Sequence, residues 1–400
     1  MQGPWRSIGF RWFFVGQSVS LTGGSMTPVA LSFAVLGTSG RTVDLAAVLA
    51  AQSIPMLAFL LLGGAVSDRV SRGKVLVLSN LGACASQGAV AVLLLSGQFH
   101  LGLIIALETV NGACVAFTMP ALRGIVPQLV DQGALHRANS LLSSSRNATK
   151  VLGPTVAGVV VAAVGGGWAI AVDAVSFAVA ALCMTQLPRA TQTMRAPHRS
   201  SLITDLREGW TEFRARSWAV VVVATFAGCN FILAGVWLVL GPTIASHTIG
   251  SAGWGIVLST RAFGLLAMGL VLYRLTPKYP LRWGHCGAAL FALPLLALSL
   301  GLPTVWLAVA ALVAGAGAAV TAITWDTALQ QHVPPQVLSR VSSFDNFGSF
   351  ATVPLGQLAV VPIAAALGST HVALAGAVLW AALALGALAA PSVRNLKAAR

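Results

Sequence analysis

The sequence predicts an all-α membrane protein with twelve transmembrane helices, and three observations support this. Apolar residues make up 56% of the 400 residues and charged residues only 8%, whereas a soluble domain carries about 25% charged residues. Apolar stretches close to the roughly 20 residues that cross a bilayer recur along the whole chain. Lysine and arginine gather in alternate connections between these stretches. Because a lipid core offers no hydrogen bonds, each stretch must satisfy its own backbone, which favours helices.

The apolar stretches fall into two groups of six. The first group is expected at residues 12–36, 45–62, 75–96, 101–119, 139–164 and 168–187. The second group is expected at residues 217–245, 253–275, 283–301, 304–325, 341–367 and 371–390. We therefore expect an N-terminal six-helix bundle over residues 1–187, a cytoplasmic linker over residues 188–216 and a C-terminal six-helix bundle over residues 217–400.

The linker contains its own helical pattern. Leu202, Leu206, Trp210 and Phe213 recur at helical spacing, and arginines are frequent around them. This pattern predicts a short amphipathic helix lying on the inner membrane face.

A repeated dipeptide relates the two halves. Val126-Pro127 and Val333-Pro334 lie in equivalent inner connections, 207 residues apart. Because this separation is about half the chain, it indicates a duplicated unit and hence two pseudo-symmetric bundles.

The distribution of charge indicates orientation and partners. The net charge is +14, but 20 of the 24 lysines and arginines fall in the tails or in alternate loops. This asymmetry follows the positive-inside rule and places both termini in the cytoplasm, without a need for a nucleic-acid partner. Arginine outnumbers lysine by 20 to 4, and alanine and glycine abound, as is typical of a high-GC bacterium. We expect a monomer in a bacterial inner membrane, with the lipid bilayer and a small-molecule substrate as partners.

A compact charged loop follows the second span. Its marked residues are Gly64, Asp68, Arg69, Arg72 and Lys74. The loop is similar to the signature of the major facilitator superfamily between helices 2 and 3, G-x-x-x-D-R-x-G-R-R/K, and departs from it at Ser71 and Gly73. The resemblance covers the whole chain and implies a transporter whose two bundles rock about a midplane site.

The same resemblance implies a latch that closes the inner side. The acid of this loop usually faces the N-terminal amides of the eleventh span, which here begins near Arg340. An acid at a helix N-terminus is favoured by the helix dipole and by hydrogen bonds. We expect Asp68 and Arg340 in this latch, with Asp345 in the same gate network. The alternative is a plain basic loop with no gating role.

Several shorter segments resemble the drug and siderophore exporter branch of that superfamily, which includes macrolide-efflux and enterobactin-exporter-like proteins. These segments are Phe10-Arg11, Gly16-Gln17, residues 173–177, residues 205–209, residues 330–334 and Arg340-Val341. Gly153-Pro154 with Gly158 partly matches the exporter signature of the fifth span, G-x-x-x-G-P-x-x-G-G, where Thr149 and Ala157 depart from it. The resemblance implies proton-coupled export of small apolar or amphipathic molecules such as antibiotics, drugs or siderophores.

Ionisable residues inside spans are candidates for proton coupling, because such groups are costly in lipid. Glu108 lies in the fourth span, and Arg146 and Lys150 lie four residues apart on one face of the fifth. If these spans adjoin, Glu108 can pair with one of the cations. Glu108 is then either a proton carrier or half of a structural ion pair. Asp173, in the sixth span, has the same two alternatives.

Polar and aromatic residues at mid-depth outline an expected substrate cavity. They are Gln17, Ser20, Gln52, Asn111, Asn230, Trp237, Arg261 and Gln357. Trp237 is a candidate for stacking on flat apolar substrates. Arg261 has no obvious acidic partner at its depth, so it either attracts anionic groups or extends towards the membrane surface. Each of these residues could instead serve interhelical hydrogen bonding or packing.

Other functions are less compatible with the sequence. An importer or facilitator of a nutrient is an alternative within the same fold. A membrane-embedded enzyme would need clustered catalytic groups, but the seven histidines are scattered and no H-E-x-x-H motif occurs. The cysteines form no C-x-x-C pair, so no metal site is expected. No Walker loop is present, so we expect no cofactor and a proton gradient as the energy source.

Overall fold

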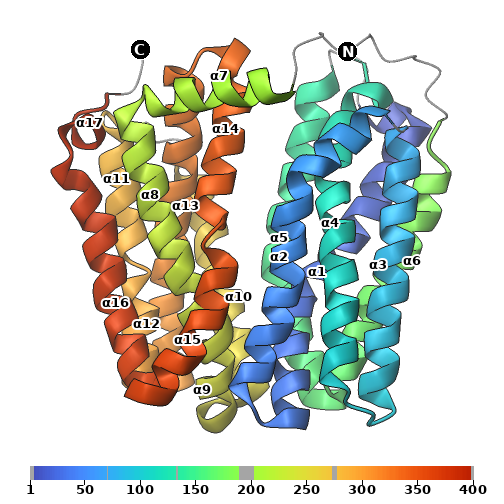
Figure 1. The fold of residues 1–400 in the computed structure, drawn as a ribbon, viewed down its shortest axis with the longest axis vertical. Coiled ribbons are helices and arrows are strands. Elements are labelled where there is room, and N and C mark those ends of the chain that lie inside the picture. Colours follow the sequence, from blue (N-terminus) through green and yellow to red (C-terminus); the bar gives the residue numbers. More distant parts are fainter. Residues whose placement is uncertain (1–3, 70, 132–133, 189–201, 273–276, 398–400) are drawn as a thin grey trace. The chain divides into compact units, whose positions relative to one another are not determined.

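The computed structural model describes residues 4–69, 71–131, 134–188, 202–272 and 277–397. Every regular element in these ranges is helical, so the predicted all-α class is confirmed. The chain divides into two compact units, Met1–Arg195 (unit 1) and Ala196–Arg400 (unit 2). Figure 1 shows the long helices of each unit running roughly parallel to one another.

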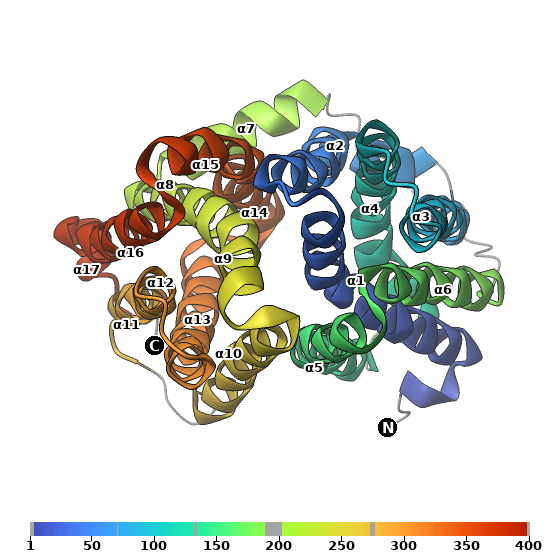
Figure 2. The same ribbon diagram turned by 90° about the horizontal axis from the view of Figure 1, so that it is seen from below.

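The described residues of unit 1 form six long helices after the short 3₁₀ helix η1 Pro4–Arg6. They are α1 Ile8–Ser39, α2 Thr42–Arg69, α3 Arg72–Leu95, α4 Leu101–Leu129, α5 Leu135–Val164 and α6 Gly166–Thr185. Helix α4 packs against α2 and α3, while α6 packs against α1 and α3. Helix α3 therefore lies between α4 and α6, as the view along the bundle shows (Figure 2).

Unit 2 begins with the linker helix α7 Leu202–Arg214 and contains several interrupted spans. The first span runs through α8 Ser217–Ile232, the π-helical segment η3 Leu233–Leu240 and α9 Gly241–Thr248. The remaining helices are α10 Gly250–Leu272, α11 Pro280–Ala289, α12 Ala292–Ser299, α13 Thr304–His332, α14 Pro335–Phe350, α15 Val353–Leu367, α16 Ser369–Gly386 and α17 Pro391–Arg394. The pairs α11–α12 and α14–α15 each form one predicted span.

Local sequence explains where several helices start and stop. The hydroxyl of Ser7 accepts a hydrogen bond from the backbone N–H of Phe10 at 3.2 Å, which caps α1. Gly40 ends the same helix with φ +65°, a conformation that favours glycine. Pro280, Pro335 and Pro391 each begin a helix, where a missing N–H costs nothing.

Eleven helical segments in the described ranges are long and apolar enough to cross a membrane. Helix α5 is the twelfth long helix of the predicted set, and its apolar part is the shorter segment Leu152–Val164. Most predicted spans are shorter than the helices observed, since hydropathy marks only the apolar part of a helix. For example, the span predicted at residues 45–62 lies within α2 Thr42–Arg69.

The predicted helix in the linker is confirmed as α7. Phe213 is buried, and its ring lies 6.3 Å from that of Phe344 in α14. The ring of Trp210 lies 5.6 Å from that of Phe344. Part of the apolar face of α7 therefore packs against α14 of the same unit.

Glycines permit close helix crossings at equivalent places in the two units. A side chain on Gly112 of α4 would overlap the carbonyl oxygen of Gln52 in α2. A side chain on Gly315 of α13 would overlap the carbonyl oxygen of Arg261 in α10. The two glycines are 203 positions apart, a separation close to that of the Val-Pro pairs. Gln52 and Arg261 therefore occupy equivalent helix crossings of the two units.

Candidate functional site

The first part of the candidate site is a carboxylate inside unit 1. The side chain of Glu108 on α4 is 0% exposed. The Nε2 of Gln87 on α3 donates to its Oε1 at 3.1 Å, and the Nδ2 of Asn111 donates to its Oε2 at 3.4 Å. Both carboxylate oxygens are thus held by neutral amides.

The second part is Asp173 on α6, which is 1% exposed. The hydroxyl of Thr27 on α1 donates to its Oδ2 at 2.6 Å. The hydroxyl of Ser176 lies 3.4 Å from its Oδ1. A side chain on Gly23 of α1 would lie only 2.6 Å from that oxygen, so this glycine lets α1 approach the acid.

These two residues, the acid pair, lie on helices at opposite sides of α3. Two salt bridges occur among the described side chains, Arg41–Asp44 at 4.0 Å and Arg216–Glu212 at 2.9 Å, and neither includes the acid pair. Within the described part of the chain, the donors to the acid pair are therefore neutral.

Among the described side chains, Glu108 forms no ion pair with Arg146, one of the two cations that the sequence offers for it. Arg146 is exposed, and α4 makes few contacts with α5. The prediction assumed that consecutive spans adjoin, whereas α4 packs chiefly on α2 and α3. The side chain of Lys150, the other predicted cation, lies outside the described residues.

The predicted latch is described only in part. Helix α2 continues through Gly64, Asp68 and Arg69, but their side chains lie outside the described residues, as does that of Arg340 in α14. Helix α2 ends at Arg69 and α3 begins at Arg72, so Arg72 and Lys74 lie in the first turn of α3. The connection between the two helices is therefore shorter than the predicted loop.

Asp345, the predicted gate acid, has two partners within unit 2. The indole Nε1 of Trp325 donates to its Oδ2 at 3.1 Å. The hydroxyl of Ser349 donates to its Oδ1 at 3.3 Å. These contacts join α13 to α14, and the expected contact with Arg340 stays a prediction.

The predicted cavity residues occupy several environments. Gln17, Ser20 and Gln52 are partly buried, while Asn111 and Gln357 are buried. Asn230 donates its Nδ2 to the carbonyl of Ser349 at 2.9 Å. Among described groups, the Oε1 of Gln357 has no hydrogen-bond partner.

Of the two roles open to Trp237, stacking on a substrate and packing between helices, its surroundings fit packing. Its side chain is 1% exposed. Its ring lies 4.7 Å from that of Trp254 and 5.3 Å from that of Phe291. Trp237 is therefore a core residue of unit 2. An apolar ring at mid-span has the same sequence signal whether it faces a core or a cavity.

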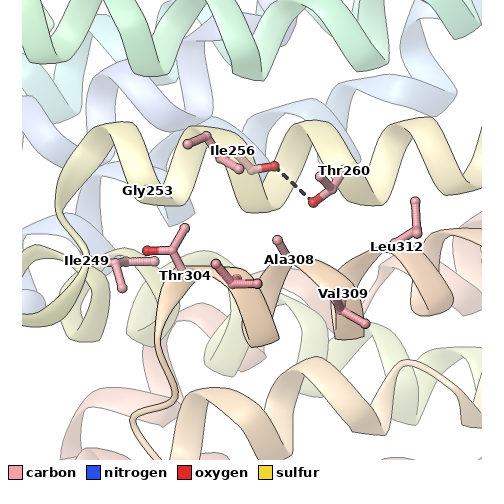
Figure 3. Close-up of a pocket in the computed structure, with 9 residues that line it drawn as sticks. Ile249, Gly253, Ile256, Thr260, Thr304, Ala308, Val309 and Leu312 are labelled. Carbon is pink, nitrogen blue, oxygen red and sulfur yellow. Dashed lines mark hydrogen bonds between the residues drawn. The ribbon is translucent and has the colours of Figure 1, made fainter.

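Unit 2 also carries an apolar groove between α10 and α13, with a volume of about 640 Å³. Figure 3 shows nine lining residues, among them Ile256 and Val309. The hydroxyl of Thr260 donates to the carbonyl of Ile256 at 2.9 Å, so this polar group is already satisfied. None of the predicted cavity residues lines the groove.

Sequence reasoning missed Gln87 and Thr27, which hold the acid pair. A long amide inside the apolar third span was the available signal for Gln87, because polar side chains in lipid need partners. Thr27 gave no such signal, since its hydroxyl can also bond the carbonyl of Gly23, here at 3.4 Å.

Comparison with known proteins agrees with this architecture. The family model described as Major Facilitator Superfamily matches residues 13–357. The multidrug efflux pump Tap of Mycolicibacterium fortuitum is 26% identical over 397 residues, covering 94% of this chain and 93% of that protein. The staphyloferrin A transporter of Staphylococcus aureus is 26% identical over 153 residues, covering 38% of each chain.

Solved structures share the fold at lower identity. The crystal structure of the nucleoside transporter NupG has a TM-score of 0.75 and 13% identity, covering 96% of this chain and 98% of that one. The family match spans most of the sequence, and the structural likeness spans nearly all of it. The chain belongs to the Major Facilitator Superfamily, and it is a multi-pass membrane transporter rather than an enzyme.

Proposed function

We propose that this transporter exports small apolar or amphipathic molecules in exchange for protons, by alternating access of its two bundles. The observation that carries the proposal is the acid pair, two buried carboxyl groups whose described hydrogen-bond donors are all neutral. An isolated ionised carboxylate in an apolar interior is costly, and such a group takes up a proton instead. Cycling between the two protonation states then couples the proton gradient to transport.

The surroundings of Glu108 suit both protonation states. The ionised form accepts from the amides of Gln87 and Asn111. The protonated form has one O–H to donate and needs an acceptor. The Oε1 of Gln87 and the Oδ1 of Asn111 are buried without a partner among the described residues. Rotation of either amide would present such an oxygen to the protonated acid.

The direction and the substrate class rest on similarity. The relative that matches nearly the whole chain is named a multidrug efflux pump, and a shorter match is named a staphyloferrin A transporter. The first name favours export over import of a nutrient, and the second name gives a transported molecule without a direction. The proton gradient would supply the energy without a cofactor. The bacterial relatives and the loop charges favour an inner membrane with both termini in the cytoplasm.

The proposal is tested by comparing bacteria with and without the protein against a panel of antibiotics and siderophores. We expect raised resistance to a subset of the panel. The compound with the largest gain is then followed in proteoliposomes with an imposed pH gradient, and its transport should accelerate with the gradient and stop with a protonophore. Transport of that compound at one rate with and without the gradient would contradict proton coupling.

A further inference from the structure

Arg261 is a charged residue deep within unit 2. It lies eleven positions after the first residue of α10, which places it about 16 Å along the helix axis at 1.5 Å per residue. Its backbone meets α13 at the close crossing with Gly315. An arginine at this depth is too far from either helix end to place its charge among lipid headgroups.

The guanidinium of Arg261 lies over the ring of Phe291, which belongs to a cluster of aromatic side chains. Its central carbon is 5.0 Å from the centroid of the Phe291 ring. The Phe291 ring also lies 4.5 Å from that of Trp380 and 5.3 Å from that of Trp237. We call Trp237, Trp254, Phe291 and Trp380 the aromatic cluster. A cation over an aromatic face gains about 0.5–2 kcal/mol, which offsets only part of the cost of burying a charge.

No described acid neutralises this charge. The Nε of Arg261 is buried and has no hydrogen-bond partner among the described residues. Of the acids described in unit 2, Glu212 pairs with Arg216 and Asp345 binds Trp325 and Ser349. Asp326 is exposed and forms no salt bridge within the described set. A guanidinium that is partly withdrawn from water, here at its Nε, and has no counter-charge is destabilising, so the site is suited to an anion from outside the chain.

We propose that Arg261 binds an anionic group, of carboxylate type, on the transported molecule. The inference rests on the proposed function and narrows its substrate class to amphipathic molecules with one acidic end. The planar guanidinium matches a carboxylate through two parallel hydrogen bonds. Arg261 is partly exposed, so an approaching group can reach the side chain.

The equivalent helix crossing in unit 1 shows that a neutral residue fits this position. Gln52 lies there against Gly112, as Arg261 lies against Gly315. Arg261→Gln therefore places in unit 2 a side chain that the duplicated architecture already accommodates. Arg261→Met supplies a second variant, since a long apolar side chain can cover Phe291 without a charge.

The test is equilibrium binding of two matched probes to the purified full-length protein in detergent. The probes are 2-naphthoate and its neutral amide, which share ring and size. We expect the wild type to prefer the anion, and Arg261→Gln and Arg261→Met to lose this preference through an anion affinity about ten- to a hundredfold lower. Arg261→Lys should retain part of the preference, because lysine keeps the positive charge but lacks the two parallel N–H donors of the guanidinium.

Three outcomes would overturn the inference. The first is a wild type without preference for the anion, and the second is an undiminished preference in Arg261→Gln and Arg261→Met. The third is inhibition of naphthoate binding by added anionic phospholipid to the same extent in the wild type and in both variants. The last result would place the anion site at a headgroup contact elsewhere. Binding is measured without a pH gradient. The role of Arg261 is therefore tested independently of proton coupling, and a failure of proton-coupled export would not change the binding result.

Discussion

Replacing Glu108 with glutamine is expected to abolish the response of transport to a pH gradient while leaving folded protein in the membrane. Glutamine has nearly the same shape as a protonated glutamate but cannot release a proton. It can still bond to Gln87 and Asn111, which hold Glu108 in the wild type. The measurement is the rate of transport in proteoliposomes with and without an imposed gradient, using the compound identified by the resistance screen.

Asp131→Asn provides the matched control for Glu108→Gln. Asp131 is an exposed acid after the end of α4, so its loss removes one negative charge without touching the acid pair. We expect the control to keep a wild-type response to the gradient. If Glu108→Gln also kept that response, Glu108 would serve only to hold α3 and α4 together.

The second large effect is expected from a side chain at either close crossing. Gly112→Val and Gly315→Val would each place a methyl-bearing carbon on a backbone carbonyl, of Gln52 or Arg261 respectively. Because a helix backbone cannot rotate away as a side chain can, the helices must separate. Overpacking that shifts the backbone typically costs about 1–3 kcal/mol, a substantial part of the usual stability of about 5–15 kcal/mol.

The readouts for these glycine variants are the yield of monodisperse protein in detergent and its thermal unfolding. Gly24→Ala and Gly37→Ala are matched controls within α1, since no atom lies within 4 Å of a side chain added there. Alanine also favours a helix over glycine. The controls should match or exceed the wild type in stability. A Gly315→Val protein as abundant and stable as wild type would contradict the observed crossing.

Much of the fold was predictable because hydropathy and charge act along one segment at a time. The ends of the helices are harder to predict from hydropathy, since α2 continues through charged residues as far as Arg69. The breaks within the spans of unit 2 are marked even less clearly in the sequence. The π-helical segment Leu233–Leu240 is uniformly apolar, and nothing in such a run marks the change in hydrogen-bond spacing.

The candidate site was predictable in its ionisable residues but not in their partners. Glu108 and Asp173 are conspicuous because charge is rare in an apolar span. Their partners depend on which helices face each other, and that is set by the packing of the whole bundle. The same limit explains why the sequence left open which cation, if any, pairs with Glu108, and whether Trp237 faces a cavity or a core.

Release of protons by the acid pair when substrate binds is the central step of the proposed exchange. This is measured by adding the exported compound to purified protein in weakly buffered detergent and recording the change in pH. We predict proton release in the wild type, a smaller release in Asp173→Asn and none in the double variant Glu108→Gln with Asp173→Asn. Substrate binding without release or uptake of protons, at every pH where buried carboxyl groups titrate, would contradict the proposed exchange of substrate for protons.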